Sequence, residues 1–181
     1  MVTGEALDLG ADALGEAKAY LRVVGSDEDA LLERLLRSAA ELCEAFTGKV
    51  LLSRDFAETI AASSAWRRLE RGPVQAISGV EAIRADGLAQ ALAVGSYAID
   101  IDARGDGWVR VTDAGGAARV RVSYTAGLAA SWGEAPEALR QGAVRLAAHG
   151  YAHRDVADGG GPPAAVTTLW RPWRRLGLRL R

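Results

Sequence analysis

Apolar side chains recur every three or four residues over residues 27–47, which is the spacing of one face of an α-helix. Ser26 with Asp29 has the form of a capping box at the start of this helix. Gly48 is expected to end it, because glycine readily adopts the left-handed conformation of a helix C-terminus. The stripe predicts that the core-facing positions are Leu31, Leu35, Leu42 and Phe46.

Two further segments have helical spacing. Residues 14–24 predict a short helix that ends near Gly25. Residues 136–154 predict a longer helix that begins at Pro136, a residue favoured in the first helical turn. Its expected core positions include Leu139 and Leu146.

Between these helices, residues 50–125 change to a period of two, which is typical of β-strands. In residues 97–102, Tyr-Ala-Ile-Asp-Ile-Asp, apolar side chains alternate with small or acidic ones. In residues 119–124, Val120, Val122 and Tyr124 alternate with polar side chains. Turn signals separate the strands, so the segment predicts an antiparallel β unit.

The order of elements therefore predicts an α+β fold: a small helical bundle with an inserted antiparallel β unit and an extended C-terminal tail. Residues 1–157 are expected to form the main domain. Residues 158–163, Asp-Gly-Gly-Gly-Pro-Pro, are expected to be a flexible joint. Residues 164–181 then form a basic, aromatic tail.

Charge is distributed unevenly along the 181 residues, although the net charge is only −1. Residues 1–47 carry ten acidic and four basic side chains, whereas residues 164–181 carry five arginines and no acid. The low net charge argues against a general nucleic-acid binder. The asymmetry indicates that the two ends meet different partners, or each other in neighbouring copies.

A single cysteine, Cys43, excludes an intrachain disulfide and a thiolate zinc cluster within one chain. Its position in the helical stripe predicts a small buried side chain. We see no secretory signal and no apolar run of membrane-spanning length, so we expect assembly in the bacterial cytoplasm.

His149 and His153 are the only histidines, and their spacing of four would place both rings on one face of a helix, as in some zinc sites. Gly150 stands where the glutamate of such a motif is required, so we interpret the pair as structural. A small metal-dependent hydrolase is the alternative, and stoichiometric zinc lost on His149→Ala would favour it. Asp100, Asp102 and Asp106 are expected to form the polar face of a strand and its turn rather than a cation site.

The nucleophile-elbow, phosphate-loop and dinucleotide motifs do not occur in the sequence, so we expect no catalysis and no cofactor. The C-terminal tail points more specifically to a function, because it is rich in tryptophan and arginine, which dominate the energetics of protein interfaces. A docking interface is the favoured interpretation, with packing onto its own domain and nucleic-acid binding as alternatives. The tail residues concerned are Trp170, Arg171, Pro172, Trp173, Arg174 and Arg175.

Five segments occur in a characteristic order. Residues 16–52 combine a short helix, an acidic turn, a long helix and Thr-Gly, and residues 71–87 contain a Pro-Val strand and a turn. Residues 120–128 end a strand in Tyr-Thr-Ala-Gly, and residues 135–155 hold a helix with His-Gly-Tyr near its end. Residues 169–178 set hydrophobic residues and arginines around a proline. In this order the chain resembles the head–tail connector, or adaptor, proteins of long-tailed bacteriophages and gene transfer agents.

The resemblance implies a structural virion protein that forms a cyclic homo-oligomer, expected to be a dodecamer. Such a ring would bind the portal protein at the head–tail junction and present a platform to a tail-side connector or stopper protein. The C-terminal segment is implied to dock on the portal, and DNA is implied to pass through the channel without specific binding. His149 and Tyr151 fall in a helix that is structural in the family. A nucleic-acid-binding packaging accessory protein is the alternative function.

The chain departs from the family pattern in three places. Gly142 and Gly150 interrupt the last helix, where the family usually has larger residues. The segment 61–66, Ala-Ala-Ser-Ser-Ala-Trp, has no obvious counterpart in the family.

Overall fold

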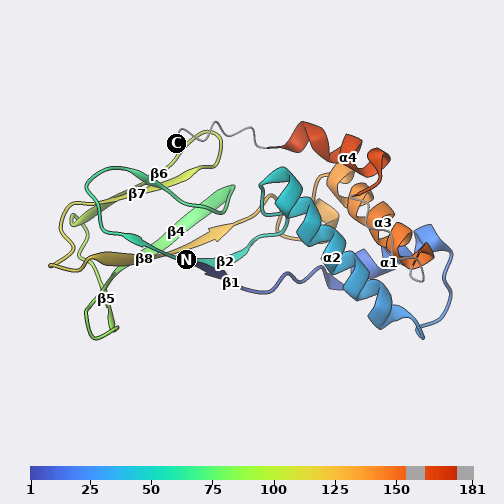
Figure 1. Cartoon of the computed structure of the whole chain (residues 1–181), viewed down its shortest axis with the longest axis horizontal. Helices are drawn as coiled ribbons and strands as arrows, with labels where there is room; N and C mark the ends of the chain where they lie inside the picture. Colours follow the sequence, from blue (N-terminus) through green and yellow to red (C-terminus); the bar gives the residue numbers. More distant parts are fainter. Residues whose placement is uncertain (154–161, 175–181) are drawn as a thin grey trace. The chain divides into compact units, whose positions relative to one another are not determined.

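A computed structural model describes residues 1–153 and 162–174 of the chain. These residues form two compact units rather than the single main domain expected over residues 1–157. A β unit comprises Met1–Ala6 and Ser53–Gly127. A helical unit comprises Leu7–Leu52 and the described part of Leu128–Arg181 (Figure 1).

The β unit contains two antiparallel sheets. The larger has the strand order β1-β2-β8-β4-β5 and the smaller has the order β3-β7-β6. The larger sheet consists of β1 (Val2–Gly4), β2 (Arg54–Ala61), β8 (Arg119–Ala126), β4 (Val74–Ile83) and β5 (Ala89–Ala91). The smaller sheet consists of β3 (Arg67–Arg68), β7 (Gly107–Val111) and β6 (Tyr97–Ile101).

The central strand β8 carries the alternation that the sequence predicted. Val120, Val122 and Tyr124 are at most 1 % exposed, whereas Arg119, Arg121 and Ser123, on the opposite face of the strand, are exposed or half-buried. The Tyr124 hydroxyl donates a hydrogen bond of 3.1 Å to the buried carboxylate of Glu58, which also accepts the Glu70 N–H at 2.9 Å. The carboxylate thereby ties β2 to the segment that follows β3, and its burial is compensated by these two donors.

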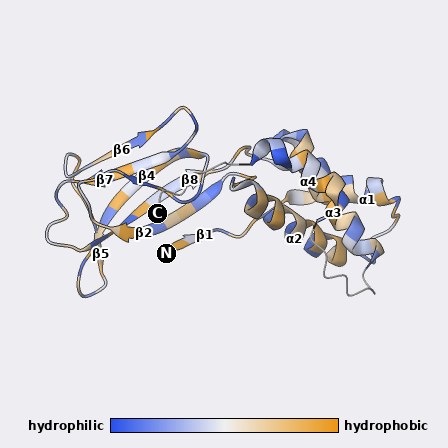
Figure 2. Cartoon of the chain, turned by 45° about the horizontal axis from the view of Figure 1, so that its top comes forward, coloured by the Kyte–Doolittle hydropathy of each residue, from blue (hydrophilic) through white to orange (hydrophobic). Residues whose placement is uncertain are grey.

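The helical unit contains four α-helices in its described residues. Figure 2 shows hydrophobic and hydrophilic positions interspersed along each of them, as expected for helices with one buried side. The helices are α1 (Gly10–Leu21), α2 (Asp29–Thr47), α3 (Glu137–Ala152) and α4 (Ala164–Trp170). Two short 3₁₀ helices, η1 (Trp132–Glu134) and η2 (Arg171–Trp173), precede α3 and follow α4.

Helix α2 ends as predicted and begins differently. Gly48 has φ 70° and its N–H bonds to the Glu44 carbonyl at 2.8 Å. The predicted capping box is wrong, because α2 starts at Asp29 with no side-chain cap. The Asp29 carboxylate instead accepts a hydrogen bond from Lys18 Nζ at 2.6 Å, which links α2 to the preceding helix.

The buried face of α2 is shifted by about one residue from the predicted stripe. Leu42 is 47 % exposed, so its assignment to the core is wrong. Leu31, Leu35 and Phe46 are only half-buried. Leucines occupy both members of the pairs 31/32 and 35/36, so the spacing alone did not settle which member faces inward. Packing against α1 and α3 selects a face formed by Leu32, Leu36, Ala39, Ala40 and Cys43.

Helix α3 carries both other expected core positions: Leu139 is fully buried and Leu146 is half-buried against the core. Gly142, a poor helix former, has a packing role here. A Cβ placed on it would lie 2.1 Å from Nε1 of Trp170, a contact that no structure tolerates. The missing side chain is therefore what lets the Trp170 indole lie directly against α3.

We predict that Gly142→Ala lowers the free energy of unfolding of the helical unit by about 1–3 kcal/mol, because overpacking outweighs the gain in helix propensity. The measurement is urea unfolding followed by far-UV circular dichroism. The matched control is Gly15→Ala in α1, where an added Cβ meets nothing within 4 Å and should raise stability by up to about 1 kcal/mol. Equal effects of the two substitutions would contradict the role given to Gly142.

We also predict that Cys43 resists alkylation in the folded protein. The side chain is 1 % exposed, and burial, with a smaller effect of the Glu44 charge, raises the pKa of its thiol from 9.0 to about 12. Three pKa units reduce the reactive thiolate about a thousandfold. Iodoacetamide at pH 8, read out by mass spectrometry, should therefore label Cys43 only after denaturation.

Ser38→Cys supplies the control for that labelling experiment, because position 38 lies on the exposed side of the same helix. This variant should take up one label rapidly in the folded state. Rapid labelling of Cys43 itself in the unmodified protein would show that the packing around α2 opens far more readily than its burial implies.

Candidate docking surface

The first part of the predicted tail packs onto the helical unit. Trp170 is fully buried, and its indole N–H donates to the Leu139 carbonyl at 3.3 Å. The Phe46 ring lies 5.9 Å from the Trp170 ring, centroid to centroid. The assignment of Trp170 to a docking surface is therefore wrong, since the space opened by Gly142 draws this side chain into its own core. For this residue, packing onto its own domain is the correct alternative.

The residues after Trp170 remain accessible. Arg171, Pro172 and Arg174 are exposed, and Trp173 is half-buried. The Arg174 guanidinium lies 5.3 Å from the centre of the Phe46 ring, and Lys49 Nζ lies 5.4 Å from the centre of the Trp173 ring. These cation–π contacts orient the segment without burying its charges. Arg175 lies outside the described residues, as do most of the joint predicted at 158–163 and the rest of the tail.

We name the cationic group formed by Lys49, Arg171, Trp173 and Arg174 the basic cluster; its two arginines are exposed, whereas Lys49 and Trp173 are half-buried. It combines three positive charges with one indole that is already held by a neighbouring side chain. Held aromatic and arginine side chains lose little conformational freedom on binding, which is a property of interface anchors. The basic cluster is therefore the part of the predicted docking surface that the described residues support.

Many acidic side chains of the first two helices and of the turn between them form hydrogen bonds or ion pairs within the helical unit. The Glu16 carboxylate accepts a hydrogen bond from the Trp132 indole at 2.7 Å and lies 3.5 Å from the Arg140 guanidinium. The Glu28 carboxylate accepts a hydrogen bond from the Tyr151 hydroxyl, and Asp29 is paired with Lys18. The acidic side chains that remain exposed are Asp8, Asp12, Asp27, Glu33 and Glu41.

The two histidines lie together near the end of α3. Their ring centroids are 4.2 Å apart, and His153 Nδ1 lies 2.9 Å from the His149 carbonyl oxygen. In the described residues, no group of three or more His, Cys, Asp or Glu side chains is arranged to hold a metal ion. His153 follows the last residue of α3, and its ring contacts the backbone of the final helical turn.

The acidic side chains of the hairpin between β6 and β7 build its turn. Asp102 Oδ1 accepts the backbone N–H groups of Arg104 and Asp106, and Oδ2 accepts the Trp108 indole N–H. The Asp106 carboxylate lies 3.6 Å from the Arg68 guanidinium. Asp102 therefore acts as a structural acceptor, and the interpretation of these acids as the polar side of a strand and turn fits this geometry.

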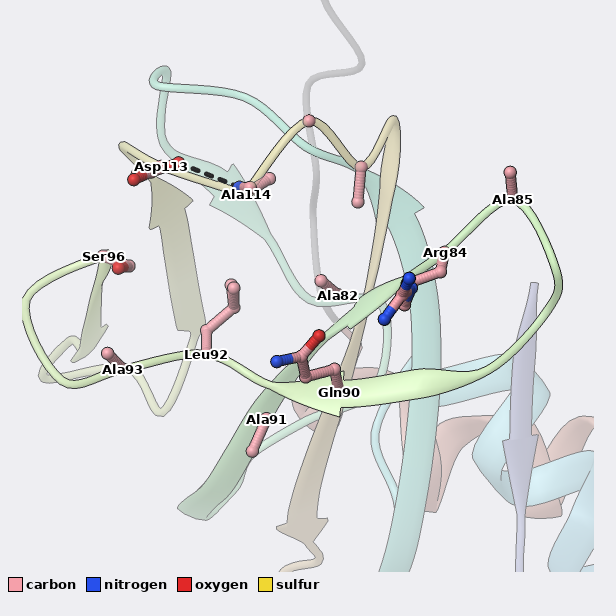
Figure 3. Close-up of a pocket in the computed structure, with 13 residues that line it drawn as sticks. Ala82, Arg84, Ala85, Gln90, Ala91, Leu92, Ala93, Ser96, Asp113 and Ala114 are labelled. Atoms are coloured by element: carbon pink, nitrogen blue, oxygen red, sulfur yellow. Dashed lines mark hydrogen bonds between the residues drawn. The ribbon is translucent and has the colours of Figure 1, made fainter.

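A groove of about 580 Å³ in the β unit was not foreseen from the sequence, because turns distant in the chain build it (Figure 3). Alanines and glycines make up most of its lining. Of its polar members, Arg84 pairs with Asp86 at 3.9 Å and Asp113 caps the Gly115 N–H at 2.8 Å. These groups serve the local turns, and the lining residues do not present an acid–base pair or a nucleophile with its base.

Over the described parts of the chain, none of the helices has the length and apolar character needed to cross a membrane.

Comparison with known proteins identifies similar chains. Residues 11–87 match the family described as phage gp6-like head-tail connector protein. No curated protein matches the sequence. Among solved structures, a chain in "Neck of empty GTA particle computed with C6 symmetry" superposes with a TM-score of 0.79 at 26 % identity, covering 98 % of this chain and 97 % of that one.

Two further structures give the same coverage and identity with a TM-score of 0.76. They are described as "Virion of native gene transfer agent (GTA) particle" and "Neck of native GTA particle computed with C12 symmetry".

Proposed function

We propose that this chain joins head to tail as a structural ring in a phage or gene transfer agent particle. The premise is that the chain is a head–tail connector protein of the phage gp6-like family. The observation that carries the proposal is the likeness to a neck protein over 98 % of the chain, including both compact units. The place of action is then the neck of the particle, at the head–tail junction. The role is assembly rather than catalysis.

The ring itself is supported by the six-fold and twelve-fold symmetry under which the similar neck structures are described. In a cyclic ring each copy contacts the next through two different surfaces. This chain offers different surfaces of that kind: exposed acidic side chains on its first two helices and the basic cluster beside its last one. A dodecamer is the stoichiometry we propose.

The portal protein is the partner we propose for the basic cluster. Arg171, Trp173 and Arg174 would contact the portal, together with Pro172 and with Arg175 in the segment that follows. Trp170 would take no direct part and would serve as the anchor that fixes their position, because it is buried beneath α3. A tail-side connector or stopper protein would bind elsewhere on the ring.

DNA would pass through the ring without specific binding. The net charge of −1 supports this, because a chain that gripped phosphates would carry an excess of basic side chains. The rival function, a nucleic-acid-binding packaging accessory protein, would instead require tight and salt-sensitive DNA binding by the isolated protein.

We predict that Arg171→Glu combined with Arg174→Glu weakens binding to the cognate portal at least about tenfold, since each reversed interfacial charge costs on the order of 1 kcal/mol or more. Both side chains are exposed, so the fold should survive. Surface plasmon resonance against immobilised portal, with far-UV circular dichroism as the folding check, provides the measurement. Deleting all of residues 164–181 is unsuitable, because it would also remove the buried Trp170.

A control with the same charge change is Arg34→Glu combined with Arg145→Glu, because both arginines are exposed on the helical unit away from the basic cluster in sequence. This variant should keep portal binding within a few-fold of the unmodified protein. Equal loss in both variants would indicate nonspecific electrostatics, and unchanged binding in the first variant would refute the docking role of the basic cluster.

A further inference from the structure

The outward face of the smaller sheet carries an exposed tryptophan in contact with an arginine. Trp66 directly precedes β3, and the centre of its ring lies 4.9 Å from the Arg110 guanidinium of β7. Arg67 lies opposite Val109, so the position before it lies opposite Arg110. Val109 is fully buried whereas Arg110 is exposed, so Trp66 and Arg110 belong to the face turned away from the core of the β unit.

Trp66 has the properties of an interface anchor. Among the described residues it is the largest of the exposed hydrophobic side chains, and it is 42 % exposed. Trp108 on the same face is different, because it is half-buried and its indole N–H donates to Asp102 at 3.2 Å. The contact with Arg110 restricts the Trp66 ring, so little conformational freedom is lost when a partner covers it.

The charge of the β unit indicates which class of partner this anchor meets. Tryptophan with arginine can stack on the bases of nucleic acid as well as bind protein. Residues 53–127 carry nine arginines, no lysine and nine acidic side chains, so this segment has no excess of positive charge to attract phosphates. A protein surface with an apolar recess and acidic side chains is therefore the favoured partner.

The helical unit has a recess of that kind. A groove of about 290 Å³ lies between the start of α1 and the first half of α2. Its apolar lining includes Leu9, Leu14 and Leu36, and its charged members are Asp8, Glu33 and Arg37. Sites for small molecules have volumes of about 300–1,000 Å³, so this groove has room for one large side chain rather than for a cofactor.

The charges around Trp66 and around the groove are complementary. The exposed Arg67 and Arg110 lie next to Trp66, and the exposed Asp100 lies on the adjacent strand β6, which gives a net charge of +1. The two carboxylates and one guanidinium of the groove give a net charge of −1. The two surfaces are different parts of the chain, as the head-to-tail contacts of a cyclic ring require.

We propose that Trp66 of one copy inserts into this groove of the neighbouring copy, with Arg110 beside the carboxylates of Asp8 and Glu33. The proposal rests on the ring proposed above and names a contact between its copies. It gives the exposed acidic side chains at the start of the first two helices a partner and leaves the basic cluster to the portal.

The first test is Trp66→Ala in the full chain. Native mass spectrometry of complexes with the cognate portal should show a loss of complete rings of at least about tenfold, because a buried tryptophan carries a large share of the binding energy of an interface. The matched control is Tyr20→Ala, which removes an aromatic side chain that is 56 % exposed and lies outside both surfaces. This control should keep ring formation within about twofold of the unmodified protein.

Far-UV circular dichroism checks the fold of both variants. Unchanged rings in Trp66→Ala, or an equal loss of rings in both variants, overturns the proposal. Intact rings together with weakened DNA binding in Trp66→Ala also overturn it and assign the anchor to nucleic acid.

The second test reverses charges across the contact and does not require Trp66→Ala to fold. One variant carries Arg110→Glu and the other carries Glu33→Arg; both side chains are exposed. Asp8 is left unchanged, because its carboxylate accepts the Gly10 N–H at 2.9 Å. Each variant alone brings net charges of the same sign together and should form at least about tenfold fewer rings at about 0.1 M salt, where charges within about 10 Å still interact.

An equal mixture of the two variants should form rings again, because every contact between unlike chains then joins net charges of opposite sign. The mass of such rings should correspond to equal numbers of the two chains. Rings at the unmodified level in either variant alone, or no recovery in the mixture, overturns the proposal. Recovery only when both substitutions are in one chain also overturns it, because the contact would then lie within a copy. Failure of the unmodified protein to form rings on the portal would instead overturn the proposed function.

Discussion

The contact on which the helical unit depends is that of the Trp170 indole with α3 at Gly142. Because position 142 has no side chain, the indole reaches the Leu139 carbonyl and lies beside the Phe46 ring of α2. One side chain therefore joins α4 to α3 and α2. Arg171 and Arg174 follow Trp170 in the chain, so the burial of Trp170 fixes where they lie. The fold therefore holds the proposed docking surface in place before any partner is bound.

Internal pairing decides which charges are left for assembly. The carboxylates of Glu16 and Glu28 receive hydrogen bonds from an indole and a phenol within the helical unit, and Asp29 receives one from Lys18. In the β unit, Glu58 and Asp102 accept bonds that fix strand connections. The acidic side chains of the N-terminal third thus partly serve the fold. Fewer of them are left for assembly than the composition of this segment suggests.

The two units contribute to a connector in different ways. The helical unit presents exposed charges of both signs, and such groups confer specificity and speed of association more than affinity. The β unit presents, in its described residues, the end strands of two sheets. A ring built from many such contacts gains stability from their number, and each contact can remain individually modest.

The sequence by itself determined the elements whose periodicity is unbroken: the long helix ended by Gly48, the central strand with Val120, Val122 and Tyr124, and the α+β class. These features depend on local backbone preferences and on one dominant period. Tertiary structure alone decided that Leu42 is exposed and that Trp170 is buried whereas Trp173 is only half-buried. Neighbouring leucines fit either face of a helix, so periodicity does not decide between them. The sequence does not distinguish the two tryptophans of the basic segment, because Gly142 on another helix makes room for only Trp170.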